Sequence, residues 1–212
     1  MPFSHLHSRL LPLYTTYATV IKPLVAEIEA RFEQFPTPIL NEIRAYNDHV
    51  ARCYVKINDT RFVEEQVNKA KSHIDRIVFD CYKYLNVALH ELIVEKFAQR
   101  TKYIDIGTIS NGEFNRIYKN SLQVITEIKE QAKHLEFHSD KEEIIVSYQQ
   151  VHSEYRKLYR FILDNEMNIR WAVARFYKRK ALNIVLWLLA AIISGIIGSM
   201  ITPFPDWFRS LF

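Results

Sequence analysis

Residues 60–92, TRFVEEQVNKAKSHIDRIVFDCYKYLNVALHEL, decide the fold of this 212-residue chain. Apolar residues recur in this stretch at steps of three and four, which is the period of one face of an α-helix. The stripe consists of Val63, Val67, Ala70, Ile74, Ile77, Cys81, Leu85, Ala88 and Leu92. The pattern predicts a long helix that continues to about residue 99 and buries one face along its length.

A second apolar stripe of the same period precedes this helix. Thr37 suits the cap of a helix N-terminus, and Pro38 suits the first turn. The stripe consists of Ile39, Ile43, Tyr46, Val50, Cys53 and Ile57. Only residues 58–60 separate the two patterns, so we expect the two helices to pack antiparallel as a long helical hairpin.

Glycine and proline are sparse, which predicts an all-α fold, a helical bundle built on this hairpin. The chain has 4 glycines and 7 prolines, and neither residue type occurs between Gly112 and Gly195. Such a stretch excludes most β architectures. Residues 6–35 also have helical spacing, and Pro12 and Pro23 predict two helical pieces or one kinked helix there.

Two capping boxes predict the starts of the helices that follow the hairpin. Residues 105–111 form a polar loop, and Ser110 with Glu113 begins a helix that ends near residue 137. Ser139 with Glu142 begins the next helix. Its buried face consists of Tyr148, Val151, Tyr155, Leu158, Phe161 and Ile162. No helix breaker follows, so we expect this helix to run continuously into the apolar segment at the C-terminus.

That segment, ALNIVLWLLAAIISGIIGSMI at residues 181–201, carries no charge and predicts one transmembrane helix. As a helix it spans about 31 Å, close to the thickness of a hydrocarbon core. Five basic residues precede it, namely Arg170, Arg175, Lys178, Arg179 and Lys180. A single arginine, offset by Asp206, follows it. The asymmetry predicts a cytoplasmic domain (1–180), a membrane span (181–202) and a short tail across the membrane (203–212).

Two further features concern assembly and compartment. Small residues recur every four positions in the apolar segment, as Ala191, Gly195 and Ser199 in one row and Ser194 and Gly198 in another. Such rows let membrane helices approach closely, so a homo-oligomer, a dimer or larger, is expected.

Cys53 and Cys81 lie inside apolar helical patterns, which predicts reduced, buried thiols and a cytosolic compartment.

Arg44 and His49 are the candidate catalytic residues. They lie in NEIRAYNDHVARCY, residues 41–54, as an Arg-x4-His pair with Asn47 and Asp48 between them. The chain has no phosphate-binding glycine loop, nucleophile elbow, HExxH motif or paired metal-ligand cluster, which counts against the commoner enzyme classes. No metal or other cofactor is therefore expected.

The following helix carries further polar residues on one face. His73, Arg76 and Asp80 are spaced three and four apart, so they share one side of that helix. We count Asn47, Asp48, His73 and Arg76 as candidate supporting residues for the Arg-x4-His pair. In the structural alternative, Arg44 and Asp48 form an ion pair on the helix surface. His49 then borders the packed face, and His73 and Asp80 are ordinary surface residues.

The pair resembles the HEPN superfamily of helical domains, whose ribonuclease members carry an Arg-x4-6-His motif. KAKSHIDRIVFDCYKYL, residues 69–85, is similar to the partner helix of some members, and the resemblance covers residues 38–92. It implies RNA cleavage without a metal ion. His49 would accept the proton of a 2′-hydroxyl, while Arg44 would stabilise the charge of the scissile phosphate.

Residues five apart on a regular helix point about 140° away from each other. Arg44 and His49 therefore converge on one phosphate only if the helix is distorted or if two subunits face each other. HEPN nucleases generally dimerise with both motifs in a shared cleft, and the resemblance implies the same arrangement here.

The sequence leaves three functions open. The first is a membrane-anchored HEPN-like ribonuclease or effector of antiviral defence that acts as an oligomer on RNA. The second is a non-enzymatic oligomeric membrane scaffold or pore, in which Arg44 and His49 are structural. The third is a tail-anchored adaptor whose helical domain binds a protein partner. All three share the membrane as a partner.

Overall fold

The computed structural model describes residues 2–33, 35–138 and 140–201, and within these ranges the chain forms helices and turns without a strand. This confirms the all-α fold. The chain divides into two compact units. We call residues up to 99 together with 116–164 the bundle unit, and residues 100–115 together with 165 onward the anchor unit.

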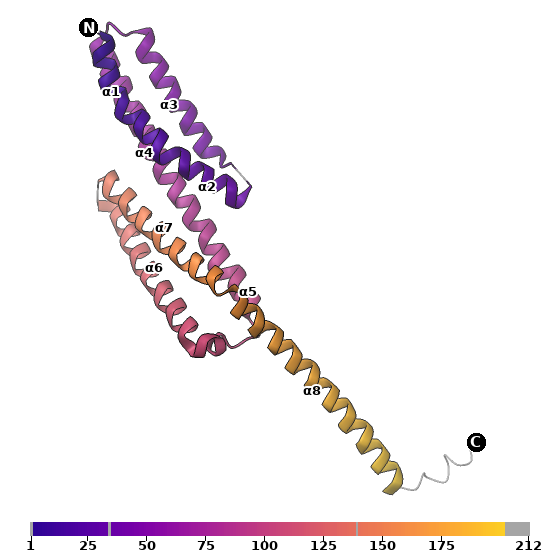
Figure 1. The fold of residues 1–212 in the computed structure, drawn as a ribbon. Coiled ribbons are helices and arrows are strands. Elements are labelled where there is room, and N and C mark those ends of the chain that lie inside the picture. The colour runs from indigo at the N-terminus through magenta and orange to yellow at the C-terminus, as the bar shows by residue number, and fades with distance from the viewer. Residues whose placement is uncertain (1, 34, 139, 202–212) are drawn as a thin grey trace, which may run out of the picture. The chain divides into compact units, whose positions relative to one another are not determined.

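The predicted hairpin is confirmed. Helices α3 (Thr37–Val55) and α4 (Thr60–His90) lie antiparallel (Figure 1). Their apolar stripes pack against each other. Most stripe residues of both helices are buried, among them Ile39, Tyr46, Val50, Cys53, Val63, Val67, Ala70, Ile74, Ile77 and Cys81. Both cysteines are free and buried, as expected.

The two helices of the hairpin begin with different caps. At α4 the side chain of Asp59 accepts a hydrogen bond from the Phe62 amide at 3.0 Å. At α3 the expected cap, Thr37, is wrong by one residue. Pro36 takes the extended N-cap conformation, and its carbonyl accepts the first helical bond from the amide of Leu40, so Thr37 already belongs to the helix.

The N-terminal segment is a helix with a π-helical interruption. Helix α1 (Pro2–Thr16) continues through η1 (Tyr17–Ile21), a π-helix, into α2 (Lys22–Phe32). Pro23 has no amide to donate to the carbonyl four residues earlier, and its ring crowds that carbonyl. A wider turn just before the proline relieves this conflict, so the predicted interruption is confirmed at Pro23. At Pro12 it is not, because this residue lies inside the unbroken α1.

Helix α4 is buried on a second face as well. Helix α7 (Lys141–Asp164) packs there, and its predicted apolar face is buried except for the half-buried Phe161. The amide of Asn86 donates to the carbonyl of Tyr148 across this interface. Leu89 of α4 and Ile93, just after its end, are fully buried, whereas the predicted Ala88 and Leu92 are half-buried.

The chain after α4 is less regular than expected. A π-helix, η2 (Glu91–Lys96), leads into α5 (Phe97–Thr101) and then into a 3-10 segment, η3 (Ile106–Gly112). Helix α6 (Glu113–His138) follows. The expected cap at Ser110 is wrong, because Ser110 has a left-handed φ of 48° and the Glu113 amide donates to its main-chain carbonyl. Ser139, the other expected cap, lies outside the described residues.

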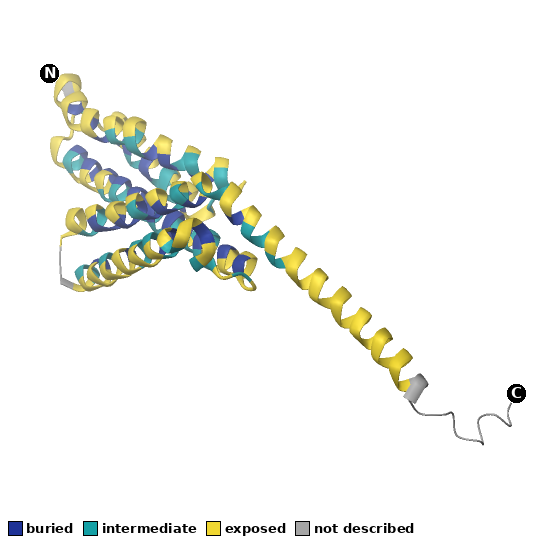
Figure 2. Cartoon of the chain, turned by 60° about the horizontal axis from the view of Figure 1, so that its bottom comes forward, coloured by how far each residue is buried: buried dark blue, intermediate teal, exposed yellow. Residues whose placement is uncertain are grey.

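The C-terminal helix α8 (Glu166–Ile201) is long and apolar enough to cross a membrane. Its apolar window is entirely exposed, as Figure 2 shows. Helix α7 does not run unbroken into it, because a turn at Asn165 separates the two. The Asn165 carbonyl accepts the first bond of α8 from Ile169, and asparagine is a favoured residue at such caps. The expected tail, residues 203–212, lies outside the described residues.

Substitutions on α4 test the central packing. Ile77 has no exposed surface, whereas Val87 on the same helix is 71% exposed. Ile77→Asp buries an unpaired charge, so it should lower the free energy of unfolding by several kcal/mol. Val87→Asp should leave it within about 0.5 kcal/mol. Thermal unfolding followed by circular dichroism measures both, and equal melting temperatures for the two variants would contradict the arrangement.

Candidate functional site

Two of the predicted histidines lie side by side on the α3–α4 hairpin. The imidazole rings of His49 and His73 stack, with centroids 5.2 Å apart and planes 21° from parallel. His49 precedes the buried Val50, and His73 precedes the buried Ile74. Each ring therefore lies at the edge of a packed stripe and is partly buried, with 18% of the His73 side chain exposed.

The antiparallel register of the hairpin explains this pairing. His49 follows Glu42 by seven residues, about two helical turns, and Gln66 precedes His73 by the same step. His73 contacts Glu42, and His49 contacts Gln66. A step forward on α3 is thus matched by an equal step back on α4. We call Glu42, His49, Gln66 and His73 the histidine seam.

Each histidine of the seam has one ring nitrogen bonded to a protein acceptor. Nδ1 of His49 lies 2.7 Å from Oε1 of the buried Gln66, and Nδ1 of His73 lies 2.6 Å from Oε2 of Glu42. Since both oxygens accept hydrogen bonds, Nδ1 carries a proton in each ring. Neither Nε2 has a hydrogen-bond partner among the described residues, so both are available for proton transfer.

Charged groups extend the seam along α4. Nη1 of Arg76 lies 3.9 Å from Oε1 of Glu42, so this carboxylate faces both His73 and Arg76. Burial, followed by repulsion from Glu42, raises the pKa of Asp80 one turn further on. Arg76 is more than half exposed and can reach a ligand at the seam.

The other predicted site residues do not join the seam. Arg44 is exposed and makes no hydrogen bond or ion pair among the described residues. The amide of Asn47 donates to the carbonyl of Ile43, one turn back on the same helix. Asp48 pairs with Arg52 at 2.7 Å, so the ion pair that the structural alternative expected between Asp48 and Arg44 is wrong. Because α3 is regular here, Arg44 and His49 stay on different sides of it within one chain.

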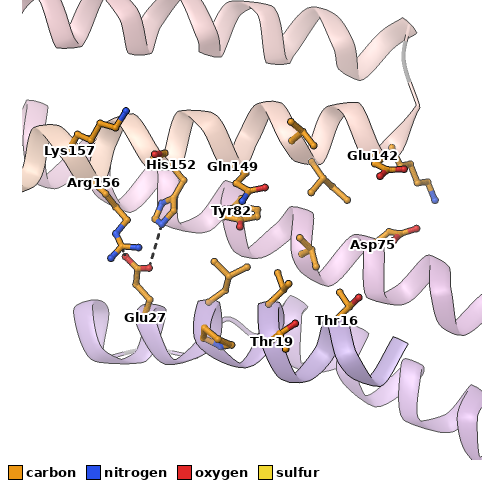
Figure 3. Close-up of a pocket in the computed structure, with 18 of the residues that line it drawn as sticks. Thr16, Thr19, Glu27, Asp75, Tyr82, Glu142, Gln149, His152, Arg156 and Lys157 are labelled. Atoms are coloured by element: carbon orange, nitrogen blue, oxygen red, sulfur yellow. Dashed lines mark ion pairs between the residues drawn. The ribbon is translucent and has the colours of Figure 1, made fainter. Parts of the chain in front are cut away.

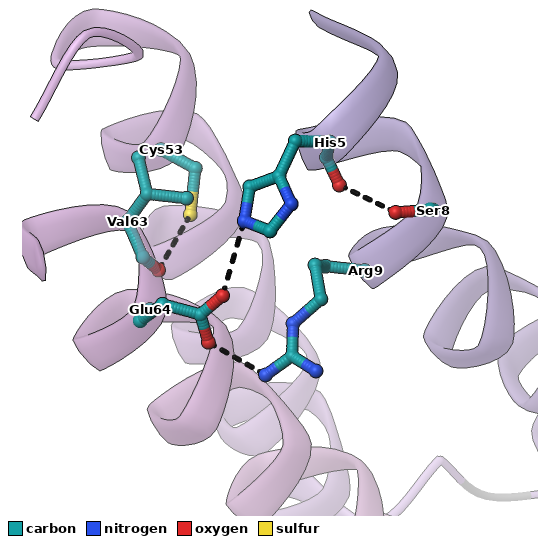
Figure 4. Close-up of polar contacts among 6 residues, drawn as sticks. All are labelled: His5, Ser8, Arg9, Cys53, Val63 and Glu64. Carbon is teal, nitrogen blue, oxygen red and sulfur yellow. Dashed lines mark hydrogen bonds and ion pairs between the residues drawn. The ribbon is translucent and has the colours of Figure 1, made fainter. Parts of the chain in front are cut away.

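A second polar cluster, which the sequence did not indicate, attaches α1 to α4. Glu64 accepts from Arg9 at 2.6 Å and lies 3.2 Å from Nε2 of His5 (Figure 4). All three side chains are at least one-third exposed, so the contact adds little stability. It orients the N-terminal helix and offers no chemistry beyond that.

A third cluster lies in a trough of about 1250 Å³ between α2 and α7, with α4 as its floor (Figure 3). Nε2 of the buried His152 lies 3.4 Å from Oε2 of Glu27. Oε1 of the same carboxylate lies 2.8 Å from Nε of Arg31 and 3.8 Å from Nε of Arg156. These four residues connect α2 to α7, and we call them the α2–α7 latch.

The latch was not predicted, although one feature of the sequence indicated that His152 has a polar partner. His152 lies between Val151 and Tyr155 on the apolar face of α7, and a polar residue in such a place usually has a partner. The partner, Glu27, precedes it by 125 residues, so no spacing rule connects them. The contact with His152 lowers the pKa of Glu27 to about 2, with help from Arg156 and Arg31 and against the effect of burial.

The comparisons with known proteins give no family for the chain. No protein-family model, curated protein or solved structure matches it. Within the described ranges, no three histidine, cysteine, aspartate or glutamate side chains come together as metal ligands.

The latch makes a testable contribution to stability. Glu27→Gln removes the charge that faces Arg31, His152 and Arg156, so it should cost about 1–3 kcal/mol of unfolding free energy. The matched control is Glu65→Gln, since Glu65 forms an ion pair with Lys69 and both are at least half exposed. The control should change stability by less than about 0.5 kcal/mol in urea unfolding.

The same carboxylate predicts a pH dependence. The pKa of Glu27 is lower in the folded protein than its ordinary value of 4.5, so its contribution is present above that value and is lost as pH falls towards about 2. The stability difference between the native protein and Glu27→Gln should therefore shrink across this range. A difference that stays constant down to pH 2 would show that Glu27 is not held by these cations.

Proposed function

We propose that this chain is a single-pass membrane protein whose bundle unit lies in the cytoplasm and acts, as a homo-oligomer, as a metal-independent HEPN-like ribonuclease. The observation that supports the chemistry is the histidine seam, where two stacked imidazoles each leave Nε2 free. The exposed apolar α8 supports the membrane anchor.

The proposed reaction uses the two histidines as base and acid. Nε2 of His49 accepts the proton of a ribose 2′-hydroxyl, and the 2′-oxygen attacks the adjacent phosphorus. Protonated His73, stabilised by the carboxylate of Glu42, returns a proton to the departing 5′-oxygen as the P–O5′ bond breaks. The products are a 2′,3′-cyclic phosphate and a 5′-hydroxyl.

An arginine must stabilise the charge on the phosphate, and two residues are available. Arg76 lies beside the seam in the same chain. Arg44 points away from it, so Arg44 contributes only if it comes from a second subunit that faces the first. The second arrangement is the shared cleft that the resemblance to HEPN nucleases implies.

A non-enzymatic oligomeric scaffold is the second candidate function. The bundle unit contains 20 of the 28 basic and 20 of the 24 acidic residues of the chain, so it has no net charge to attract RNA. In this alternative the seam is a structural contact of the hairpin, and Arg44 is a surface residue.

Asparagine substitutions separate the two functions. The Asn side-chain amide can replace Nδ1–H of histidine, so His49→Asn keeps a donor for the buried Gln66 but has no base. His49→Asn and His73→Asn should each reduce RNA cleavage by the full-length protein at least about a hundredfold, with little change in melting temperature. The control His134→Asn changes an exposed histidine on α6 and should retain full activity. Cleavage should also survive addition of a chelator.

Mixed oligomers test the shared cleft. Arg44→Ala and His49→Asn subunits should each be inactive alone, yet their mixture should regain part of the activity, because one cleft then combines an intact Arg44 with an intact His49. Full activity of Arg44→Ala by itself would assign the phosphate contact to Arg76. Absence of any cleavage by the native protein would leave the scaffold as the better account.

The orientation has its own test. A protease added to intact cells should leave the segment 60–99 undigested, because the positive residues before the anchor favour the proposed cytoplasmic side for the bundle unit. Permeabilised cells serve as the control, in which the same segment should be cut. Digestion in intact cells would show the opposite orientation.

A further inference from the structure

The net charge of the protein is confined to the anchor unit. The bundle unit is neutral, whereas the anchor unit contains 8 basic and 4 acidic residues and so carries the whole formal charge of +4. From Arg170 to Lys180 there are five basic residues and no acidic one. This part of α8 is therefore the most positive stretch of the chain.

Four of these cations have no ion-pair partner in the part of the chain that the structure describes. Arg170 is neutralised by Glu166, which also binds Arg100. The remaining four, Arg175, Lys178, Arg179 and Lys180, make no ion pair or hydrogen bond within the described residues, and we call them the basic collar. No acidic group within the described residues neutralises the collar, so its cations are open to an anion of another molecule.

The collar lies at the depth of lipid headgroups if α8 spans the membrane. The uncharged segment starts at residue 181, and a helix rises about 1.5 Å per residue. Lys178 to Lys180 then lie within about 5 Å of the hydrocarbon edge, and Arg175 lies about 9 Å from it. A headgroup layer is roughly 5–8 Å thick on each side.

The surface beside the collar has the two-part chemistry of a phospholipid. A hollow of about 500 Å³ along α8 is lined by Phe176, Arg179, Lys180, Asn183, Ile184 and Trp187. Its cations precede the apolar segment along α8, and Ile184 and Trp187 lie one to two turns into that segment. Such a surface offers cations to the phosphate of a lipid headgroup and apolar contact to its acyl chains. Free phosphate and RNA have no acyl chains, so they would not use the apolar part.

Aromatic contacts hold this part of α8 against the rest of its unit. The rings of Tyr103 and Phe176 stack, with centroids 6.3 Å apart and planes 13° from parallel. Lys102 lies 5.4 Å from the centre of the Tyr103 ring. The stack thus brings one further basic residue from the loop before η3 to the same region as the collar.

We infer that the basic collar and the adjoining hollow form a binding site for anionic phospholipid headgroups in the leaflet on the bundle side. The inference rests on the proposed membrane anchor and adds a lipid preference to it. Each cation that contacts an anionic headgroup should favour that lipid by on the order of fivefold over a zwitterionic one.

Energy transfer in proteoliposomes tests this site, with the full-length protein and its tryptophans as donors. Trp187 lines the hollow itself. The acceptors are dansyl-labelled phosphatidylglycerol and dansyl-labelled phosphatidylcholine at equal amounts in separate samples. Transfer to phosphatidylglycerol should be favoured about fivefold or more at 0.1 M salt. The preference should vanish at 1 M salt, where the screening length falls to about 3 Å.

Two charge variants assign the effect to the collar. Replacement of all four collar residues by glutamine should abolish the preference and keep transfer to both lipids. The control replaces Lys69, Lys96, Lys119 and Lys129, which are exposed in the bundle unit, by glutamine and should keep the full preference. Since both leaflets hold the labelled lipid, the orientation of the reconstituted protein does not affect either result.

The outcomes separate this inference from the proposed function. Equal transfer to the two lipids in the native protein would overturn the lipid site and leave the anchor intact. Absence of transfer to either lipid would refute the anchor. Displacement of labelled phosphatidylglycerol by a short single-stranded RNA, lost in the collar variant, would assign the collar to nucleic acid and overturn the inference.

Discussion

The burial of α4 on two faces is the constraint on which the bundle unit depends. One face packs against α3 through the stripe that contains Ile77 and Cys81, and the other packs against α7. Two buried amides mark these interfaces, because Gln66 is hydrogen-bonded to His49 on α3 and Asn86 to the chain of α7. A helix buried in this way leaves only narrow edges where polar side chains can meet solvent.

The histidine seam lies on such an edge, and this explains its composition. A titratable group at an edge can keep a buried partner and still reach water, as His49 does through Gln66 on one side and open Nε2 on the other. The latch lies deeper, and its His152 and Glu27 are mostly buried. We therefore interpret the latch as a contact that fixes α2 on α7, and the seam as the place where chemistry with an external substrate is feasible.

Charge is divided between the two units in a way that suits a membrane protein. The neutral bundle unit can pack, oligomerise or bind a partner without long-range repulsion, whereas the basic collar concentrates its field near the apolar segment. The break at Asn165 separates α7 from α8, so the helix that carries the collar starts anew at Glu166. A salt bridge of Glu166 to Arg100 and the stack of Tyr103 on Phe176 hold its first turns within the anchor unit.

The sequence by itself determined the helices, the hairpin and the apolar α8, because each is a local pattern repeated over many residues. It also indicated His49 and His73 as candidate site residues. The motif that indicated them, however, pairs His49 with Arg44 and not with His73. Only the tertiary structure decided which side chains meet. The antiparallel register joins His49 to His73 and leaves Arg44 outside, and Glu27 meets His152 from 125 residues away. The caps at Thr37 and Ser110 were wrong because the start of a helix depends on which carbonyl accepts the first hydrogen bond, and several neighbouring residues can do so. The helical period depends on residues that are close along the chain. A contact between two helices depends on how the helices pack, and local spacing in the sequence does not determine that.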